Sequence, residues 1–312
     1  MFPGGNFDKD DGSHRVTAIR ETFEETGLLL ARSRSTSGSE QSASRVLDQD
    51  MLNRSRQSIL RGQTTFSKFL DDSGLTPAVD KLLPFTEWIT PVQAPRCETF
   101  PLSSHLIYTF KGIWNLVRRF HARFYVAFLH GSSLSGSFSH GSKEDFVPTP
   151  DGGQEVISAR FVHPAEALRA HRKKEMMFMP PQYYLIDVLA EVLVGGKNTE
   201  AQRERVKRVS EGAFGRMVVQ PRQVRGGEGK VVLAFERDEA VGGEVGARHR
   251  SVIVPGPGGV SFLFCGSDEG LGSFYPPIYA DDEGQVPTEV DLQRNIDVFE
   301  TGGVGATKNA KL

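Results

Sequence analysis

Three glutamates near the start of the chain have the side-chain type and spacing that suit metal-assisted chemistry. Glu21, Glu24 and Glu25 lie in the run Arg20–Gly27, which reads RETFEETG. On a helix, residues three and four apart share a face, so these carboxylates would crowd together on one turn. Because carboxylates repel each other, such a group is stable mainly when a cation neutralises it. Oxygen ligands of this kind suit Mg²⁺ or Mn²⁺.

The simplest alternative is an exposed helix face, where glutamates are usually found solvated by water. Two flanking features favour a site instead. The turn sequence Phe2-Pro3-Gly4-Gly5 precedes the helix. Gly27 follows the carboxylates and predicts the end of the helix, and the apolar residues 28–30 come next. Arg20 can also hold a carboxylate through two parallel hydrogen bonds.

The order of turn, acidic helix, Gly and apolar segment resembles the Nudix box, the signature of hydrolases that cleave diphosphates linked to another moiety. The second half of that box, Arg-Glu-aliphatic-x-Glu-Glu-x-Gly-aliphatic, matches residues 20–28, with Thr22 at the aliphatic position. In the first half, Gly5 is one residue too far from Arg20, and Gly12 occupies the place of the first Glu. The nearby acids that would replace this Glu are Asp8, Asp10 and Asp11.

The resemblance implies a role for each acidic residue. Glu24 and Glu25 would be metal ligands, Glu21 a ligand and candidate base, and Arg20 the residue that orients Glu21. Bound Mg²⁺ or Mn²⁺ would bridge phosphate oxygens and lower the pKa of a water molecule. Glu155, at the start of a predicted strand, is a further candidate for substrate binding, with a solvent-facing strand end as the alternative.

Later motifs resemble one Nudix branch, which acts on coenzyme A in peroxisomes. In that branch a Pro-Arg pair runs directly into Arg-Phe. Here Pro95-Arg96 and Arg119-Phe120 are separated by the segment Cys97–Arg118. We interpret this segment as an intron retained in frame, with a genuine surface insertion as the alternative. The resemblance covers most of residues 2–195 and also includes the motifs at residues 88–91, 164–168 and 180–184.

This branch implies cleavage of coenzyme A or acyl-CoA to 3′,5′-ADP and 4′-phosphopantetheine or its acyl form. A second interpretation is a Nudix hydrolase that acts on another nucleoside diphosphate, such as ADP-ribose or NADH. A third is a catalytically inactive Nudix-like protein, which the displaced first acid and the segment at residues 97–118 favour. The C-terminal Ala310-Lys311-Leu312 resembles the Ser-Lys-Leu peroxisomal address, so we expect a peroxisomal location and an import receptor as partner.

The resemblance implies an α+β fold, with a Nudix-type α/β/α sandwich around a mixed sheet. We expect residues 1–195 to form this domain without its first strands, which would precede the turn at residues 2–5. Residues 196–312 carry short strand patterns between Gly-rich turns, and so predict a small β-rich extension. Helices are predicted at residues 13–26, 45–60 and 65–70, with a further helix that begins at residue 163 and another that ends at residue 193. Strands are predicted at residues 28–31, 119–128 and 155–162.

Composition excludes several classes of function. The net charge of −2 gives no reason to expect nucleic acid as a partner. Only Cys97 and Cys265 are present, so neither a disulfide framework nor a thiolate metal site is implied. No apolar stretch reaches membrane-spanning length. Tyr183 and Tyr184 could stack on an adenine, although aromatic residues on an apolar helix more often belong to the core.

Overall fold

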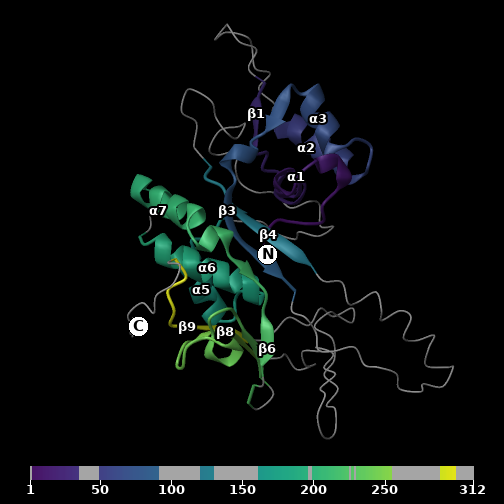
Figure 1. The fold of residues 1–312 in the computed structure, drawn as a ribbon. Coiled ribbons are helices and arrows are strands. Elements are labelled where there is room, and N and C mark those ends of the chain that lie inside the picture. Colours follow the sequence, from purple (N-terminus) through teal and green to yellow (C-terminus); the bar gives the residue numbers. More distant parts are fainter. Residues whose placement is uncertain are drawn as a thin grey trace, which may run out of the picture. The chain divides into compact units, whose positions relative to one another are not determined.

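The computed structural model describes residues 2–34, 49–90, 120–129, 161–195, 199–224, 226–227, 230–254 and 289–299. Helices are combined with antiparallel and parallel strand pairs, so the predicted α+β class is confirmed (Figure 1). The chain divides into two compact units, each discontinuous in sequence: Met1–Pro84 with Tyr125–His163, and Phe85–Phe124 with Pro164–Leu312. The predicted domain boundary between residues 195 and 196 stays a prediction.

The first unit gathers helices and short strands from the N-terminal part of the chain (Figure 1). Strands β1 and β2 pair antiparallel, with Arg32 opposite Thr76. All three predicted helices of this region are confirmed. The predicted strand at residues 28–31 begins only at Ala31, where the pairing with β2 starts. The elements are η1 (Lys9–Asp11), α1 (His14–Thr26), β1 (Ala31–Ser33), α2 (Gln49–Leu60), α3 (Phe66–Asp72), β2 (Leu75–Pro77) and η2 (Val79–Lys81).

Helix α1 begins and ends at the residues that the sequence predicts. The Ser13 side chain accepts a hydrogen bond from the Val16 amide at 3.3 Å and caps the N-terminus. At the other end Gly27 adopts the left-handed conformation, with φ of 75°, and donates to the carbonyl of Phe23 at 2.8 Å. The acidic run is therefore a helix that stops directly after Thr26.

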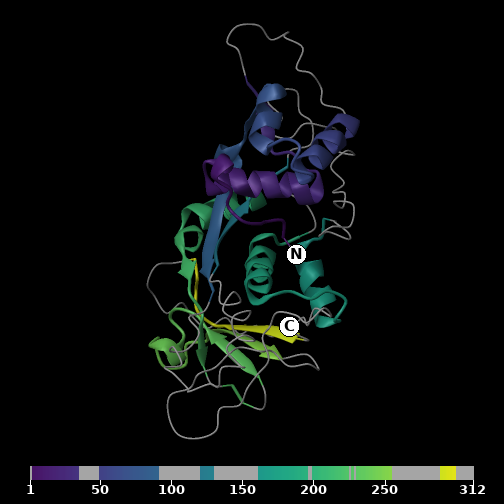
Figure 2. The same ribbon diagram turned by 90° about the vertical axis from the view of Figure 1, so that its right-hand side faces the viewer.

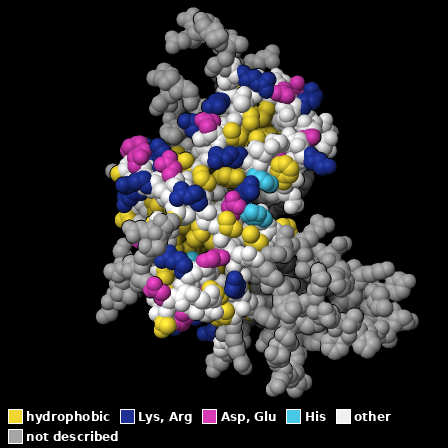
Figure 3. Space-filling view, in the orientation of Figure 1, with side chains coloured by type: hydrophobic (Ala, Val, Ile, Leu, Met, Phe, Trp, Pro, Cys, Tyr) yellow, Lys and Arg dark blue, Asp and Glu magenta, His cyan; other side chains and the backbone are white. Residues whose placement is uncertain are grey.

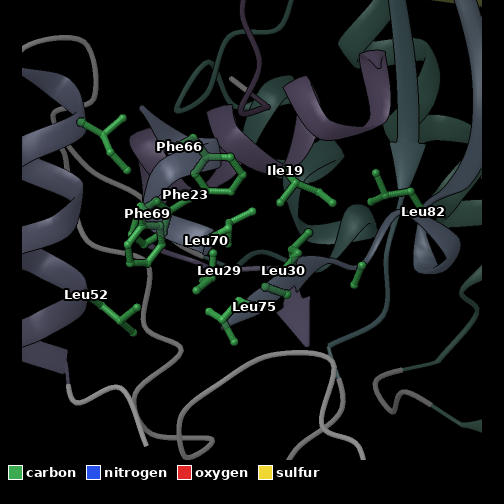
Figure 4. Close-up of a cluster of buried hydrophobic side chains, with 13 residues drawn as sticks. Ile19, Phe23, Leu29, Leu30, Leu52, Phe66, Phe69, Leu70, Leu75 and Leu82 are labelled. Carbon is green, nitrogen blue, oxygen red and sulfur yellow. The ribbon is translucent and has the colours of Figure 1, made fainter. Parts of the chain in front are cut away.

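The inner face of α1 packs into an apolar core (Figure 4). Ile19 and Phe23 are completely buried, and the Phe23 ring stacks on that of Phe69 with a centroid separation of 5.4 Å. Burying side chains of this size contributes about 2–3 kcal/mol each. Because these two positions face the core, the helix cannot rotate, and Arg20 and Glu24 are fixed on a flanking face.

The second unit contains a three-stranded sheet, ordered β4-β3-β5 with β3 and β5 parallel, and a four-stranded antiparallel sheet, ordered β6-β7-β8-β9. In Figure 2 the teal helices α5 and α6 lie beside each other, close to the yellow strand β9. Its elements, of which β3 and β4 extend into the first unit, are β3 (Leu83–Ile89), β4 (His121–Val126), α5 (Pro164–Arg172), α6 (Pro180–Val192), α7 (Glu200–Glu211), η4 (Phe214–Arg216), β5 (Val218–Val219), β6 (Arg222–Val224), β7 (Val231–Ala234), η5 (Glu239–Val241), β8 (His249–Val254) and β9 (Glu289–Arg294).

The sequence predicts most of these elements. The strand expected at residues 119–128 is β4, the helix expected from residue 163 is α5, and the helix expected up to residue 193 is α6. Of the short strands expected after residue 196, β6, β7 and β8 lie in the antiparallel sheet, whereas β5 pairs with β3. Strand β9, which completes the antiparallel sheet, was not predicted. The segment Cys97–Arg118 and most of the strand predicted at residues 155–162 lie outside the described residues.

A buried tyrosine–histidine pair joins α6 to the antiparallel sheet. The Tyr184 hydroxyl lies 2.7 Å from His249 Nε2, and His249 Nδ1 lies 2.7 Å from the carbonyl oxygen of Glu236. Because a carbonyl only accepts, Nδ1 carries the proton and the neutral ring accepts from Tyr184 at Nε2. Tyr184 is completely buried, so it belongs to the core and is not a surface for stacking an adenine.

The surface carries mixed charges. On the face shown in Figure 3, Lys and Arg side chains are interspersed with Asp and Glu side chains on both units, in keeping with the net charge of −2. None of the helices in the described ranges has both the length and the apolar character that crossing a bilayer requires.

The buried histidine predicts how stability depends on pH. Burial lowers the pKa of His249 from 6.5 to about 4 in the folded chain. Between these two values the unfolded chain binds more protons, so stability is full above pH 6.5 and falls as the pH falls toward 4. The loss is about 3 kcal/mol at most. Urea unfolding at pH 5 and pH 7.5, followed by tryptophan fluorescence, should show this loss in the wild-type chain.

Two variants test the assignment. His249→Gln, which has no titratable ring, should be less stable at pH 7.5 but should lose less stability between the two pH values. His14→Gln replaces an exposed histidine and should keep the full pH dependence. An equal pH dependence in the His249→Gln variant would show that another group is responsible.

Candidate functional site

Arg20 on α1 forms a two-pronged ion pair with Asp11. Its Nε atom lies 2.9 Å from Asp11 Oδ1, and its Nη2 atom lies 3.1 Å from Asp11 Oδ2. The pair is largely shielded from water, with 14% of the Arg20 side chain and 3% of the Asp11 side chain exposed. Two parallel, charge-assisted bonds fix the plane of the guanidinium. Arg20 is therefore held in one orientation on the flank of the helix.

The same guanidinium contacts two of the predicted site glutamates. Its Nη1 atom lies 2.9 Å from Glu21 Oε1 and 3.1 Å from Glu24 Oε2. Its Nη2 atom also donates to the carbonyl of Asn6 at 2.9 Å. One positive charge thus faces three carboxylates, including Asp11. Arg20 is therefore shared among three carboxylates from two elements.

Glu25 is held by the N-terminal turn. Its Oε1 atom accepts a hydrogen bond from the Gly4 amide at 3.3 Å. The neighbouring Gly5 lies against Glu21, so closely that a Cβ atom on Gly5 would be 2.3 Å from Glu21 Oε1. The turn at residues 2–5 is therefore in contact with the outer carboxylates of the helix, and Gly5 is required for Glu21 to take this position.

The structure selects one of the three acids that the sequence left open for the first position of the box. Asp8 and Asp11 cap each other in the short helix η1, with the Asp8 amide donating to Asp11 Oδ2 at 3.1 Å. Asp11 follows Gly5 at the spacing of the box, and the extra residue falls between Asp11 and Arg20. Gly12 ends η1 in the left-handed conformation, with φ of 68°. The displaced acid therefore still reaches Arg20.

Burial and charge shift the pKa values within the cluster in opposite directions. Burial by itself raises the pKa of Asp11, but hydrogen bonds from Arg20 and from the Asp8 amide outweigh it and hold this pKa below its ordinary value. Burial raises the pKa of Glu24, and repulsion from Glu21 adds to it against the attraction of Arg20. Asp11 thus binds Arg20 as a carboxylate, whereas the charge on Glu24 is incompletely compensated.

A second arginine fixes the N-terminal half of α1. Arg15 Nη1 donates to the carbonyls of Val79 and Leu82, at 2.8 and 2.7 Å. Its guanidinium also lies 5.5 Å from the centre of the Tyr125 ring, within the range of a cation–π contact. These contacts tie the helix to the segment around η2.

Arg20, Glu21 and Glu24 are therefore brought together. Glu25, on the same helix, contacts the N-terminal turn through the Gly4 amide. Glu155 falls outside the described residues. Within the described part of the chain, no group of three or more His, Cys, Asp or Glu side chains is arranged so that it could hold a metal ion as it stands. Arg20 occupies oxygen atoms of Glu21 and Glu24. The chemistry of the donors nevertheless fits a hard divalent cation, because the donors are carboxylate oxygens.

The chain matches one protein-family model and has named relatives in other organisms. The family model for the NUDT19 Nudix domain matches residues 4–189 of the chain. The chain is 26% identical over 173 residues to a Xenopus laevis protein named acyl-coenzyme A diphosphatase NUDT19, a match that covers 54% of this chain and 37% of that protein. It is 27% identical over 177 residues to the Gallus gallus protein of the same name, a match that covers 54% of this chain and 38% of that protein.

The matched stretch therefore spans less than two fifths of the length of these relatives. No solved structure matches the chain significantly.

The Asp11–Arg20 pair predicts a large loss of stability when only one partner is removed. Asp11→Asn should destabilise the chain by about 1–3 kcal/mol, because it weakens the two charge-assisted hydrogen bonds from Arg20 to a carboxylate that the folded chain favours. The control is Asp10→Asn, whose exposed side chain lies in the same short helix and should shift stability by no more than about 0.5 kcal/mol. Denaturant titration of both variants measures the difference. Equal stability of the two variants would contradict the structural role of Asp11.

Proposed function

The chain belongs to the Nudix hydrolase family through its NUDT19 Nudix domain, and on that premise we propose that it is a metal-dependent diphosphatase acting on coenzyme A or acyl-CoA. The products are 3′,5′-ADP and 4′-phosphopantetheine or its acyl form. The names of the frog and chicken relatives support this substrate class. The observation that carries the proposal is the cluster in which one guanidinium, that of Arg20, faces the carboxylates of Asp11, Glu21 and Glu24.

The gathered carboxylates support a role for a divalent cation in the proposed reaction. Glu21, Glu24 and Glu25 would hold Mg²⁺ or Mn²⁺. When bound, the ion would neutralise the charge of the diphosphate and lower the pKa of a water molecule. Because the diphosphate repels an incoming nucleophile, this electrostatic contribution is the largest that such a site can make.

The remaining steps belong to side chains whose positions are described. Glu21 would accept the proton of the attacking water on its carboxylate. Arg20, fixed by Asp11, keeps Glu21 Oε1 in place at 2.9 Å. Gly5 leaves room for that carboxylate, because any side chain there would collide with it. The role that we assign to Asp11 is to hold Arg20.

The substrate is tested by incubating the whole chain with Mg²⁺ or Mn²⁺ and a panel of diphosphates. The panel contains coenzyme A, a short-chain and a long-chain acyl-CoA, ADP-ribose and NADH, with products separated by chromatography. Release of 3′,5′-ADP from coenzyme A or acyl-CoA supports the proposal. Preferred cleavage of ADP-ribose or NADH overturns the substrate class, and no turnover with any compound overturns the enzymatic function.

Glu24→Gln should lower the rate on the order of 100-fold or more, because it removes a charged ligand oxygen that the transition state needs. Its melting temperature should hardly change, since the raised pKa of Glu24 shows that the folded chain does not favour this charge. Glu200→Gln on α7 is the matched control, a largely exposed glutamate that should keep full activity. A Glu24→Gln variant as active as the control would refute the assignment of this ligand.

We also propose that the chain is imported into peroxisomes, with the C-terminal Ala310-Lys311-Leu312 as the segment that the import receptor binds. A fluorescent protein fused to the N-terminus should show a punctate signal that coincides with a peroxisomal marker. The same fusion without Leu312 should be diffuse. A punctate peroxisomal signal from both fusions would exclude this tripeptide as the address.

A further inference from the structure

Three backbone carbonyls in the last turns of α1 accept hydrogen bonds from three different kinds of donor. The carbonyl of Thr22 accepts from the Thr26 hydroxyl at 2.5 Å, and that of Phe23 accepts from the Gly27 amide at 2.8 Å. The carbonyl of Glu24 accepts from Arg56 Nε at 2.7 Å. A helix end leaves its last four carbonyls without partners within the helix, so the donors to Phe23 and Glu24 stabilise the end of α1. Only Arg56 comes from another element.

Arg56 lies on α2, far from the acidic run in the sequence, and is among the most buried charged residues. Only 3% of its surface is exposed. Burying a guanidinium is unfavourable unless it is hydrogen-bonded and compensated by negative charge. The C-terminus of a helix carries partial negative charge, which is greatest on carbonyls such as that of Glu24. The position of Arg56 therefore suits this helix end in both hydrogen bonding and charge.

Glu24 is consequently held at both ends by arginines from different elements. Its carboxylate lies 3.1 Å from Arg20 Nη1 on the same helix. Its backbone carbonyl is bound by Arg56 from α2. A side chain on the last turn of a helix would otherwise move as that turn frays. Fixing the backbone of Glu24 limits where its carboxylate can lie.

We propose that Arg56 is a positioning residue for the carboxylate site: by binding the carbonyl of Glu24 it keeps the last turn of α1 formed and Glu24 in place to ligate a divalent cation. The inference deepens the proposed function and rests on it. Arg56 lies outside the Nudix box and does not itself contact the diphosphate. It acts through the backbone of Glu24.

Arg15 provides a matched control within the same unit. It also binds backbone carbonyls with its guanidinium, and it also anchors α1. Its contacts lie at the N-terminal half of the helix, away from Glu24 and Glu25. Loss of either arginine should lower the stability of the chain, but only the loss of Arg56 should change the carboxylate site.

The test compares the wild-type chain with the Arg56→Met, Arg56→Lys and Arg15→Met variants. Amide hydrogen exchange of residues 20–30 reports whether the last turn of α1 is formed. Mn²⁺ affinity, measured by electron paramagnetic resonance, reports the ligands without any turnover. Steady-state kinetics with acyl-CoA then separates kcat from KM.

Arg56→Met should speed exchange at the end of α1 and weaken Mn²⁺ binding by about 10–100-fold, the range typical of residues that support a metal ligand. Its kcat at a fixed Mn²⁺ concentration should fall and should recover in part at high Mn²⁺. Arg56→Lys keeps the charge but loses the Nε donor, so it should fold and lie between Arg56→Met and the wild type. Arg15→Met should lower the melting temperature and leave Mn²⁺ affinity unchanged.

Wild-type Mn²⁺ affinity in both Arg56 variants would overturn this inference alone. So would an equal loss of affinity in Arg15→Met, which would show a general effect of stability. If the wild-type chain binds no Mn²⁺ and cleaves no diphosphate, the proposed function itself fails, and the role of Arg56 toward a metal fails with it. Should Arg56→Met not fold, the Arg56→Lys variant decides by the same criteria.

Discussion

The carboxylate site depends on a single guanidinium that is shared among acids from two elements. Arg20 is fixed by both oxygens of Asp11 in η1 and uses its remaining Nη1 donor on Glu21 and Glu24 of its own helix. Without this charge, three carboxylates would be gathered in a region largely shielded from water, where repulsion is weakly screened. With it, the repulsion is reduced but not cancelled. The divalent cation that we propose would reduce this repulsion further.

The core of the first unit makes this arrangement possible. Ile19 and Phe23 are completely buried, so the orientation of α1 is set by apolar packing and not by the charges. The arginines then act at separate points along the helix, Arg15 near its start and Arg56 near its end. Most of the free energy that holds α1 in place therefore comes from buried apolar surface, while the arginines determine where its polar side chains lie.

Local signals in the sequence predicted α1 well. Ser13, Gly27 and the apolar periodicity around Phe23 act over one or two turns, and the helix follows them closely. The two-pronged pair of Arg20 with Asp11 could not be predicted in this way, because it depends on how Gly12 turns the chain between η1 and α1. No pattern in the sequence indicates a role for Arg56, since its contact with Glu24 arises from the packing of α2 against α1. Glu155 lies outside the described residues, so its predicted role stays a prediction.

The contact between Gly5 and Glu21 has a consequence for any attempt to transplant this chemistry. The acidic helix on its own would have the right sequence. It would lack the backbone of Gly5 beside Glu21 and the Gly4 amide that donates to Glu25. A transplanted fragment would have to include the continuous stretch of residues 4–27. The host protein would also have to supply a positively charged side chain in place of Arg56 at the end of the helix. A search that compares only helical segments between proteins would miss that requirement.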